Sequence, residues 1–394
     1  MDIIKKENKK IVLFKANKIL KTTNKILKYS NSLVNSEWIY KIYKWADEYN
    51  IPDKIIPRDK VKLLHLTELN LTDLKLESIP KEIGNLTHLK GLYLGDNKLI
   101  TIPKEIGNLK NLRGLYLGHN RLEFLPDEIG NLESLVAFFL GYNYLTQLPE
   151  SIGNLKNLES LNVSRNKLFQ VPKSLNNLQS LVGLNLSRNN LTEISINNLT
   201  SLEALHLGDN KFNEINIENL TKLEELYLNS NNLIAFPKGI ENFKFLYKLS
   251  LGDNKIREIP ESIGNLTNLE ELYLYSNEIT SIPKSVKNLK SLNCLFLGSN
   301  KIKKLPNEIV QLQSLEELYL FANQIDSLPK EICKLEKLKT IDIYANNILE
   351  LPECINNLSN IKIFDIQEND IKLTPFQEEY LKELRRRGAI IEGI

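Results

Sequence analysis

One nine-residue string recurs along almost the whole chain at a constant spacing. The string Leu89–Asn97 (LKGLYLGDN) is followed by equivalent strings that start at Leu112, Leu135, Leu158 and Leu181, each at the same interval after the last. A constant period of this kind indicates an array of similar units, each stacked on its neighbours. We therefore expect one elongated solenoid with a continuous core, although a chain of 394 residues would otherwise suggest several domains.

The sequence contains fourteen such repeats, which together span residues 66–375. They start at Leu66, Leu89, Leu112, Leu135, Leu158, Leu181, Leu202, Leu223, Leu246, Leu269, Leu292, Leu315, Leu338 and Ile361. The first repeat has Leu74 where the others have asparagine. The repeats that start at Leu181 and Leu202 are two positions shorter than the others and lack the usual proline, so we expect the arc of the solenoid to flatten over residues 194–222.

Each repeat predicts a short strand, a tight turn and a helical turn. The L-x-L pair should form a parallel strand with both leucines directed inward. The asparagine should then turn the chain and bond neighbouring backbone groups. The segment Pro103–Leu109 suits one or two turns of helix with proline near the start. The predicted class is an α/β solenoid, with a curved parallel sheet on its concave face and helical turns on its convex face.

Two segments are expected to cap the ends of the solenoid, because a terminal repeat would otherwise expose its leucines. In residues 34–65, apolar residues fall on one face of a predicted helix: Trp38, Ile42, Trp45, Ala46 and Tyr49. In residues 376–394 we expect a helix capped by Thr374-Pro375 and then an edge strand. Arg385–Arg387 fit the end of that helix better than a nucleic-acid site.

The amino-terminal segment 1–33 is strongly basic. Between Met1 and Ser30 it holds nine lysines against Asp2 and Glu7, and its apolar residues follow helical spacing. A basic amphipathic helix of this kind suits an anionic membrane surface or an acidic partner. The alternatives are a helix docked on the solenoid and a lysine-rich tail. The net charge of the whole chain is only +2, which does not favour nucleic acid as a partner.

The cysteines and apolar runs predict a cytoplasmic protein. Cys294, Cys333 and Cys354 show no paired spacing, which argues against a disulfide framework and suits a reducing compartment. The longest apolar run of the amino terminus, Ile11–Phe14, is too short for a secretory signal. Secretion by a route without a cleaved signal peptide is the alternative.

No motif for catalysis or cofactor binding stands out. The chain has no glycine-rich phosphate-binding loop, and the two histidines expected on the concave face, His119 and His206, are four strands apart. We therefore expect no cofactor and no metal.

Paired glutamates recur in alternate repeats, at Glu224-Glu225, Glu270-Glu271 and Glu316-Glu317. The expected separation of these carboxylates overlaps that of the two catalytic carboxyl groups of an inverting glycosidase. However, an open sheet offers no closed pocket that would raise the pKa of one of them. We interpret them as a solvated acidic stripe and expect no enzyme.

The outward positions of the strands carry many aromatic residues, although this face should be solvated. Such clusters usually mark interaction sites; cross-strand stacking that stabilises the sheet is the alternative. We expect a partner to bind here, and the flanking Glu225, Glu271 and Glu317 suggest that it is basic. The aromatic candidates are Tyr93, Tyr116, Phe139, Tyr227, Tyr273, Tyr275, Phe296, Tyr319, Phe321 and Tyr344. Arg165 and Arg188 take equivalent positions in adjacent repeats, where they would grip a carboxylate or phosphate or be simple surface arginines.

The repeat in Pro80–Asn97 (PKEIGNLTHLKGLYLGDN) resembles the typical 23-residue leucine-rich repeat. It is similar to cytosolic repeats of the Ras-suppressor and plant intracellular Ras-group kind and to those of many bacterial proteins. Residues Trp45–Lys60 resemble the segment before the first repeat in a group of bacterial relatives. The resemblance implies protein binding with diverse partners, a small GTPase among them.

The sequence thus predicts a monomeric, non-enzymatic scaffold in intracellular signalling that binds another protein on its concave face. The alternative is a bacterial host-directed effector or surface protein that engages a host protein or an anionic membrane.

Overall fold

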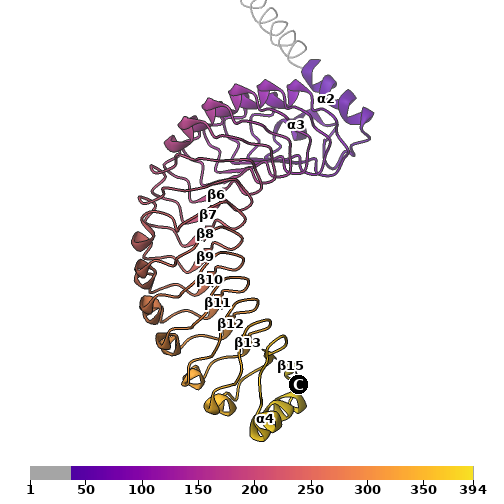
Figure 1. Ribbon diagram of the computed structural model, residues 1–394. Helices are drawn as coiled ribbons and strands as arrows, with labels where there is room; N and C mark the ends of the chain where they lie inside the picture. The colour runs from indigo at the N-terminus through magenta and orange to yellow at the C-terminus, as the bar shows by residue number, and fades with distance from the viewer. Residues whose placement is uncertain (1–36, 394) are drawn as a thin grey trace, which may run out of the picture.

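In each repeat, a triplet of residues with an inward apolar residue at its centre forms a short strand. Each strand pairs in parallel with the equivalent triplet of the next repeat. The computed structural model describes residues 37–393, and its strands follow chain order in one 15-stranded sheet (Figure 1). Leu69 pairs with Leu92 and Leu92 with Leu115, and this in-register pattern continues to the last strand. The predicted solenoid is therefore confirmed.

The strands share one length and one position in the repeat. They are β1 (Glu68–Asn70), β2 (Gly91–Tyr93), β3 (Gly114–Tyr116), β4 (Ala137–Phe139), β5 (Ser160–Asn162), β6 (Gly183–Asn185), β7 (Ala204–His206), β8 (Glu225–Tyr227), β9 (Lys248–Ser250), β10 (Glu271–Tyr273), β11 (Cys294–Phe296), β12 (Glu317–Tyr319), β13 (Thr340–Asp342), β14 (Ile363–Asp365) and β15 (Ile390–Glu392).

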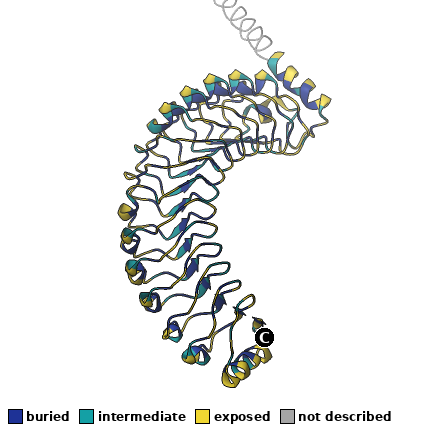
Figure 2. Ribbon diagram, in the orientation of Figure 1, coloured by how far each residue is buried: buried dark blue, intermediate teal, exposed yellow. Residues whose placement is uncertain are grey.

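A single apolar core runs along the inside of the solenoid, between the sheet and the convex side (Figure 2). In one repeat, the fully buried residues include Leu92, Leu94, Leu99, Ile106 and Leu109, and leucines or isoleucines at most of the equivalent positions of the other repeats are buried too. Because every repeat buries the same set of positions against both neighbours, the core continues without a break from the first repeat to the last.

The convex side is built from short 3₁₀ turns, most of which follow a proline. Proline suits the residue before the turn because its fixed φ, −68° at Pro103, matches the extended backbone found there. The turns are Lys81–Asn85, Lys104–Asn108, Asp127–Asn131, Glu150–Asn154, Lys173–Asn177, Ile240–Asn242, Glu261–Asn265, Lys284–Asn288, Asn307–Gln311, Ile332–Lys334 and Glu353–Asn357.

The two shortened repeats have no 3₁₀ turn, since the row of turns passes directly from Lys173–Asn177 to Ile240–Asn242. An open recess of about 460 Å³ lies on this flank, lined among others by Glu193, Ile194 and Glu214. The shortened convex segment matches the sequence pattern. The flattening of the arc over residues 194–222 stays a prediction.

A ladder of buried asparagines ties each repeat to the one before it. The Asn97 side chain donates from Nδ2 to the carbonyls of Leu71, Leu94 and Gly95, at 2.8, 3.0 and 3.0 Å. Its Oδ1 accepts from the backbone N–H groups of Leu74 and Leu76, at 3.1 and 2.9 Å. The same pattern recurs down the solenoid, so these side chains satisfy backbone groups that would otherwise be buried without partners.

Helices cover both described ends of the solenoid. At the amino-terminal end, α2 (Glu37–Glu48) buries Ile39, Ile42, Trp45 and Ala46, and the short helix α3 (Lys60–Leu64) leads into β1. At the other end, α4 (Pro375–Arg386) begins with a capping box at Thr374 and is followed by β15.

The basic segment 1–33 lies outside the described residues. In the part of the chain that is described, no helix has the length and hydrophobicity needed to span a bilayer.

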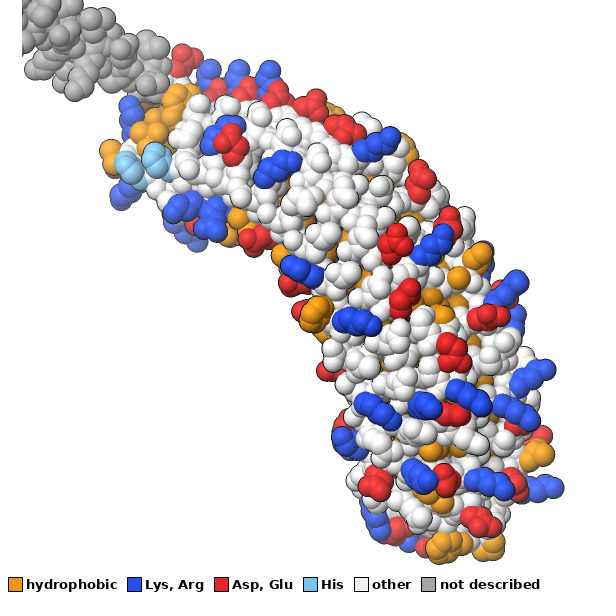
Figure 3. Space-filling view, turned by 90° about the vertical axis from the view of Figure 1, so that its left-hand side faces the viewer, with side chains coloured by type: hydrophobic (Ala, Val, Ile, Leu, Met, Phe, Trp, Pro, Cys, Tyr) orange, Lys and Arg blue, Asp and Glu red, His pale blue; other side chains and the backbone are white. Residues whose placement is uncertain are grey.

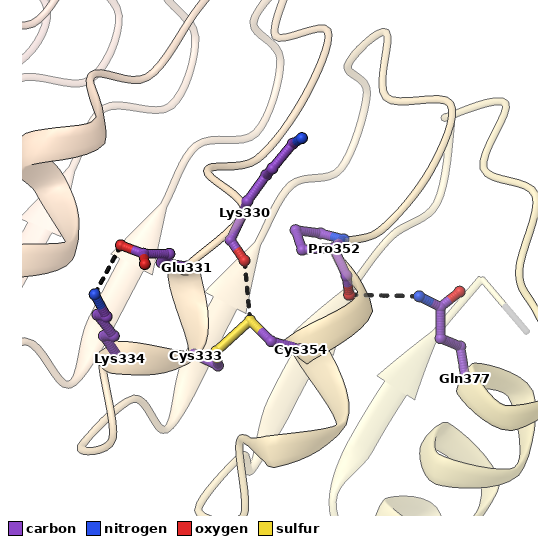
Figure 4. The surroundings of a disulfide bond; sticks show 7 residues. All are labelled: Lys330, Glu331, Cys333, Lys334, Pro352, Cys354 and Gln377. Atoms are coloured by element: carbon purple, nitrogen blue, oxygen red, sulfur yellow. Dashed lines mark hydrogen bonds and ion pairs between the residues drawn. A yellow bond between two sulfur atoms is a disulfide. The ribbon is translucent and has the colours of Figure 1, made fainter.

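A disulfide joins Cys333 to Cys354, which corrects the prediction made from the cysteine spacing (Figure 4). The two residues are 21 positions apart, and each lies in the 3₁₀ turn of its own repeat. Other neighbouring convex turns also meet through residues 21 positions apart. Gly107 and Glu128 are one such pair, because a Cβ on Gly107 would approach Glu128 Cβ to 2.9 Å. The strands instead pair at the longer offset of a full repeat, as Leu69 and Leu92 do, so the sequence period conceals this contact. Cys294 is free and buried.

We expect Asn300→Ala to destabilise the solenoid by about 3 kcal/mol, because it leaves buried backbone groups without partners. Asn300 accepts from Ile279 N and donates to three carbonyls. Urea unfolding followed by circular dichroism measures the change. The control is Asn268→Ala, which removes a single exposed bond to Lys244 O. Equal effects of the two variants would contradict a structural role for the ladder.

We expect the non-reduced protein, once denatured, to present one thiol per chain, that of Cys294, because Cys333 and Cys354 are joined. Reduction should lower the stability by about 3 kcal/mol through the released loop. It should have no such effect on the double variant Cys333→Ser/Cys354→Ser. A thiol assay in denaturant and thermal unfolding with and without reductant measure both. Finding every thiol free in the non-reduced protein would contradict the disulfide.

Candidate functional site

The concave face presents the last residue of each strand as one continuous column, called here the central column. Strand pairing places Tyr93 beside Tyr116 and Phe296 beside Tyr319. The face seen in Figure 3, which carries the 3₁₀ turns, instead mixes lysine and arginine with acidic side chains and has only small hydrophobic groups. The rows of neighbouring aromatic side chains therefore lie on the concave face.

Three rings stack in the amino-terminal half of the central column. The Tyr93 and Tyr116 rings have centroids 4.6 Å apart and planes 5° apart, and Tyr116 and Phe139 follow at 5.2 Å and 11°. The stack needs a small residue beneath it, since a Cβ on Gly114 would lie 2.8 Å from the Tyr116 ring. This part of the face is explained well by cross-strand stacking.

Five rings meet farther along the sheet in the group called here the aromatic cluster, which consists of Tyr273, Tyr275, Phe296, Tyr319 and Phe321. Phe296 is its centre, with ring centroids 6.2 Å from Tyr273, 5.2 Å from Tyr275, 4.7 Å from Tyr319 and 5.6 Å from Phe321. All five side chains remain half-buried. Tyr344, another of the predicted aromatic candidates, contacts no other aromatic ring among the described residues and is 39% exposed.

Glycines lie beneath two of these rings, a feature that the sequence analysis missed. A Cβ on Gly252 would approach the Tyr275 ring to 2.4 Å, and one on Gly298 would approach the Phe321 ring to 2.5 Å. The two rings therefore pack closely against the glycine that follows the preceding strand by two positions. The alternation of glycine and aromatic residues at 252, 275, 298 and 321 was the signal that could have revealed it.

The predicted acidic stripe is engaged with its neighbours and is not simply solvated. Glu271 accepts from Lys248 Nζ at 2.6 Å and from the Tyr273 hydroxyl at 2.7 Å. Burial favours a higher pKa for Glu271, but these bonds outweigh burial and lower its pKa. Lys248, in the register position between Glu225 and Glu271, had not been singled out in the sequence.

Glu225 and Glu317, which take the same strand position as Glu271, also accept from tyrosines. The Tyr247 hydroxyl donates to Glu225, and this bond, with some burial, raises the pKa of Tyr247 to about 12. The Tyr319 hydroxyl donates to Glu317 at 3.2 Å. Burial and the Glu271 bond likewise raise the pKa of Tyr273. The tyrosines are therefore neutral hydrogen-bond donors that fix the carboxylates in place.

Arg165 and Arg188 each have a partner within the chain. The Arg165 guanidinium lies 4.5 Å above the Tyr142 ring, which in turn stacks on His119 at 3.9 Å. Arg188 Nε lies 3.3 Å from Asp209 Oδ2. Both arginines are exposed, and each is engaged with a different residue: Arg165 with Tyr142 and Arg188 with Asp209. The pair fits two separate surface cations better than a preformed anion clamp.

A shallow hollow of about 480 Å³ adjoins the aromatic cluster. Its lining is mostly apolar and consists of Tyr227, Asn229, Lys248, Ser250, Tyr273, Tyr275 and Phe296. An open apolar hollow with a few polar groups suits the side chain of a partner better than catalysis, which needs a site closed to water. Within residues 37–393 no three His, Cys, Asp or Glu side chains are grouped to hold a metal ion.

His206 lies beside the hollow, with its ring 4.4 Å from that of Tyr227 and its Nε2 3.8 Å from Glu225. Burial lowers its pKa below the ordinary value of 6.5, although Glu225 opposes the shift. The unfolded chain then binds a proton below pH 6.5 more readily than the folded chain, so folding stability falls as the pH drops through this range.

We expect His206→Asn to reduce the loss of thermal stability between pH 7 and pH 5, because asparagine does not titrate. Asparagine already occupies the same column at Asn185. Thermal unfolding at both pH values measures the loss, with the exposed His88→Asn as the control. A His206→Asn variant with the pH dependence of the wild type would contradict a buried neutral His206.

Comparisons with known proteins match this architecture. Among solved structures, the chain is 38% identical to a leucine-rich repeat protein of Leptospira interrogans, with a TM-score of 0.80 over 84% of this chain and 85% of that one. It is 32% identical to the plant peptide hormone receptor RGFR1, solved in complex with RGF2, with a TM-score of 0.56 over 78% of this chain and 60% of the receptor. An internalin, InlF of Listeria monocytogenes, is 24% identical with a TM-score of 0.69 over 89% and 95%, which shows the fold alone.

The sequence comparisons lead to the same family. A search of curated proteins found no match to the chain. The family model of the leucine-rich repeat region, however, matches residues 52–138, 138–235 and 237–324, which is more than half of the chain. The protein therefore belongs to the leucine-rich repeat family.

Proposed function

We propose that the protein is a non-enzymatic scaffold that binds a protein or peptide partner on its concave face, at the aromatic cluster. The observation that carries the proposal is the convergence of four half-buried rings on a fifth, Phe296. Tyrosine and phenylalanine are enriched at the centres of interfaces, and a contiguous apolar patch on a solvated face usually marks one. Leucine-rich repeat proteins typically act as binding scaffolds.

Cross-strand stacking alone does not account for the aromatic cluster. The Tyr93–Tyr116–Phe139 stack shows what stacking produces on this sheet: nearly parallel rings, each beside the next. In the cluster the planes differ by 50° for Tyr275 and Phe296 and by 71° for Phe296 and Phe321. The rings thus form a two-column patch with exposed edges and faces, which suits contact with another molecule. The plant receptor RGFR1, solved with RGF2, supports a peptide as one kind of partner.

The compartment and the kind of partner are part of the proposal. The Cys333–Cys354 disulfide favours an oxidising compartment, so we favour the alternative of a secreted protein over the cytoplasmic one. A small GTPase partner, contact of residues 1–33 with a membrane surface, and the monomeric state stay predictions.

We expect the triple variant Phe296→Ala/Tyr319→Ala/Phe321→Ala to lose its protein partners, with a fall in affinity of at least about tenfold, because hot-spot aromatic residues contribute about 2 kcal/mol or more each. Affinity capture from extracts of the source organism, followed by titration with each captured protein, measures the loss. Circular dichroism establishes that the variant is folded.

The matched control is Phe124→Ala/Phe169→Ala/Phe245→Ala, which removes three exposed rings outside the strands. This control should keep its partners. If the cluster variant retained every partner of the wild type, the concave-face proposal would be wrong.

A further inference from the structure

Between β8 and β12, the run of aromatic residues in the central column is interrupted at one strand, β9. In the carboxy-terminal half of the sheet, the column holds Tyr227, Ser250, Tyr273, Phe296 and Tyr319 in register. Ser250 therefore leaves a gap the width of one ring between two tyrosines. The hollow described above lies over this gap, with Ser250 in its floor.

The walls of the hollow are held in position by the rest of the sheet. Tyr275 is packed closely against Gly252, Tyr273 is bonded to Glu271, and Phe296 contacts both tyrosines. On the opposite side stands Tyr227, whose ring packs on His206. Because these side chains already have defined partners, the hollow exists before any ligand enters it, and little ordering is needed on binding.

Lys248 shows that a cation is stable among these rings. Its Nζ lies 5.8 Å from the centroid of Tyr227 and 5.5 Å from that of Tyr273, within the range of cation–π attraction. Its charge is already matched by Glu271 at 2.6 Å. The Lys248–Glu271 pair therefore adds little net charge to the hollow.

The charge that remains around the hollow is negative. Asp253 directly follows Gly252, is exposed, and has no ion pair among the described residues. Burial, the Asp253 carboxylate and Asp209 together raise the pKa of Tyr275. Glu225 on the other side is bonded to the neutral Tyr247 hydroxyl. Neither carboxylate lines the hollow itself, but Asp253 lies close to Tyr275 and Glu225 close to Tyr227, both of which do. Their negative charge lacks a full cationic partner and favours a positively charged occupant.

We propose that the hollow over Ser250 receives an arginine side chain from an extended, basic segment of the partner, with its guanidinium stacked on the tyrosine rings and directed toward Asp253. The flat guanidinium fits between rings and pairs with carboxylates, and it is more weakly hydrated than an ammonium group. This inference rests on the proposed function and specifies the chemistry of the partner.

The test uses the full-length protein and two short peptides, acetyl-Gly-Ser-Gly-X-Gly-Ser-Gly-amide, in which X is arginine or its uncharged isostere citrulline. Titration at low ionic strength is followed by NMR of the aromatic rings. We expect the arginine peptide to shift the signals of Tyr227, Tyr273 and Tyr275, and the citrulline peptide to bind at least about fivefold more weakly, as the loss of a cation–π contact implies.

Two substitutions address the hollow in different ways. Ser250→Tyr fills it with a ring of the kind found in the same column at Tyr227 and Tyr273, and should abolish the arginine preference. Asp253→Asn keeps the shape and removes the charge, and should weaken binding of the arginine peptide about threefold, as the loss of an exposed ion pair implies. Asparagine tolerates the left-handed backbone of residue 253, where φ is +55°.

Matched controls lie at the far end of the sheet. Asn70→Tyr adds a ring to the same column at β1, and Asp96→Asn makes the same charge change at an equivalent left-handed residue, where φ is +54°. Both should bind the arginine peptide as the wild type does. Three outcomes would each overturn the inference. The two peptides bind equally well, the arginine peptide at millimolar concentration shifts no ring signals, or Ser250→Tyr binds the arginine peptide as the wild type does.

Failure of this test is distinguishable from failure of the proposed function. If the peptides do not discriminate while the Phe296/Tyr319/Phe321 variant still loses its partners, the arginine inference is wrong and the scaffold proposal stands. If that variant keeps every partner, the proposed function itself is wrong.

Discussion

The hydrogen bonds of the asparagine ladder determine the shape of the repeats after the first, which has Leu74 at this position. A short strand forms few ladder bonds with its neighbours and would leave the turn after it without partners. Asn97 closes that turn by bonding Leu94 and Gly95 in its own repeat and Leu71, Leu74 and Leu76 in the preceding one. Because the same bonds recur at Asn120 and Asn143, adjacent repeats share one geometry. The outward residues of the strands are then free to vary without changing the fold.

The ladder also dictates what lies along one rim of the concave face. The residue before each asparagine adopts a left-handed backbone, with φ from +49° at Ser276 to +59° at Tyr142, and none of these residues is glycine. Such a conformation costs a non-glycine residue about 1 kcal/mol. It turns each of these side chains to the rim, where Tyr142 contacts Arg165 and Arg188 pairs with Asp209. Asp253 occupies the same left-handed position and is close enough to Tyr275 for its charge to raise the pKa of that tyrosine, so the charge near the hollow follows from the geometry of the turn.

The sequence was sufficient to predict the solenoid and the identity of the outward side chains, because both follow directly from the constant period of the repeats. It was insufficient wherever a contact joins residues at another offset. The Cys333–Cys354 disulfide was missed because convex turns meet at a shorter offset than the strands do. The engagement of Glu271 was missed for another reason: Lys248 lies at the regular offset and Tyr273 lies in the same strand, but the period does not say which side chains bond one another. Ser250 was visible in the aromatic column, but its role as the floor of a hollow depends on how Tyr275 folds over Gly252.

The side chains of the aromatic cluster are partly exposed to solvent, yet their conformations are fixed by contacts within the sheet. This combination distinguishes the cluster from a merely hydrophobic surface. A flexible exposed ring loses rotamer freedom when a partner binds, and that loss opposes association. Here Tyr275 and Phe321 rest on glycines, Tyr273 and Tyr319 are bonded through their hydroxyls to glutamates, and Phe296 is surrounded by the other four. The rings have thus been ordered during folding, through interactions within the sheet itself. A partner that meets them gains contact area without ordering them again, which is the physical advantage of building an interface on a rigid array of repeats.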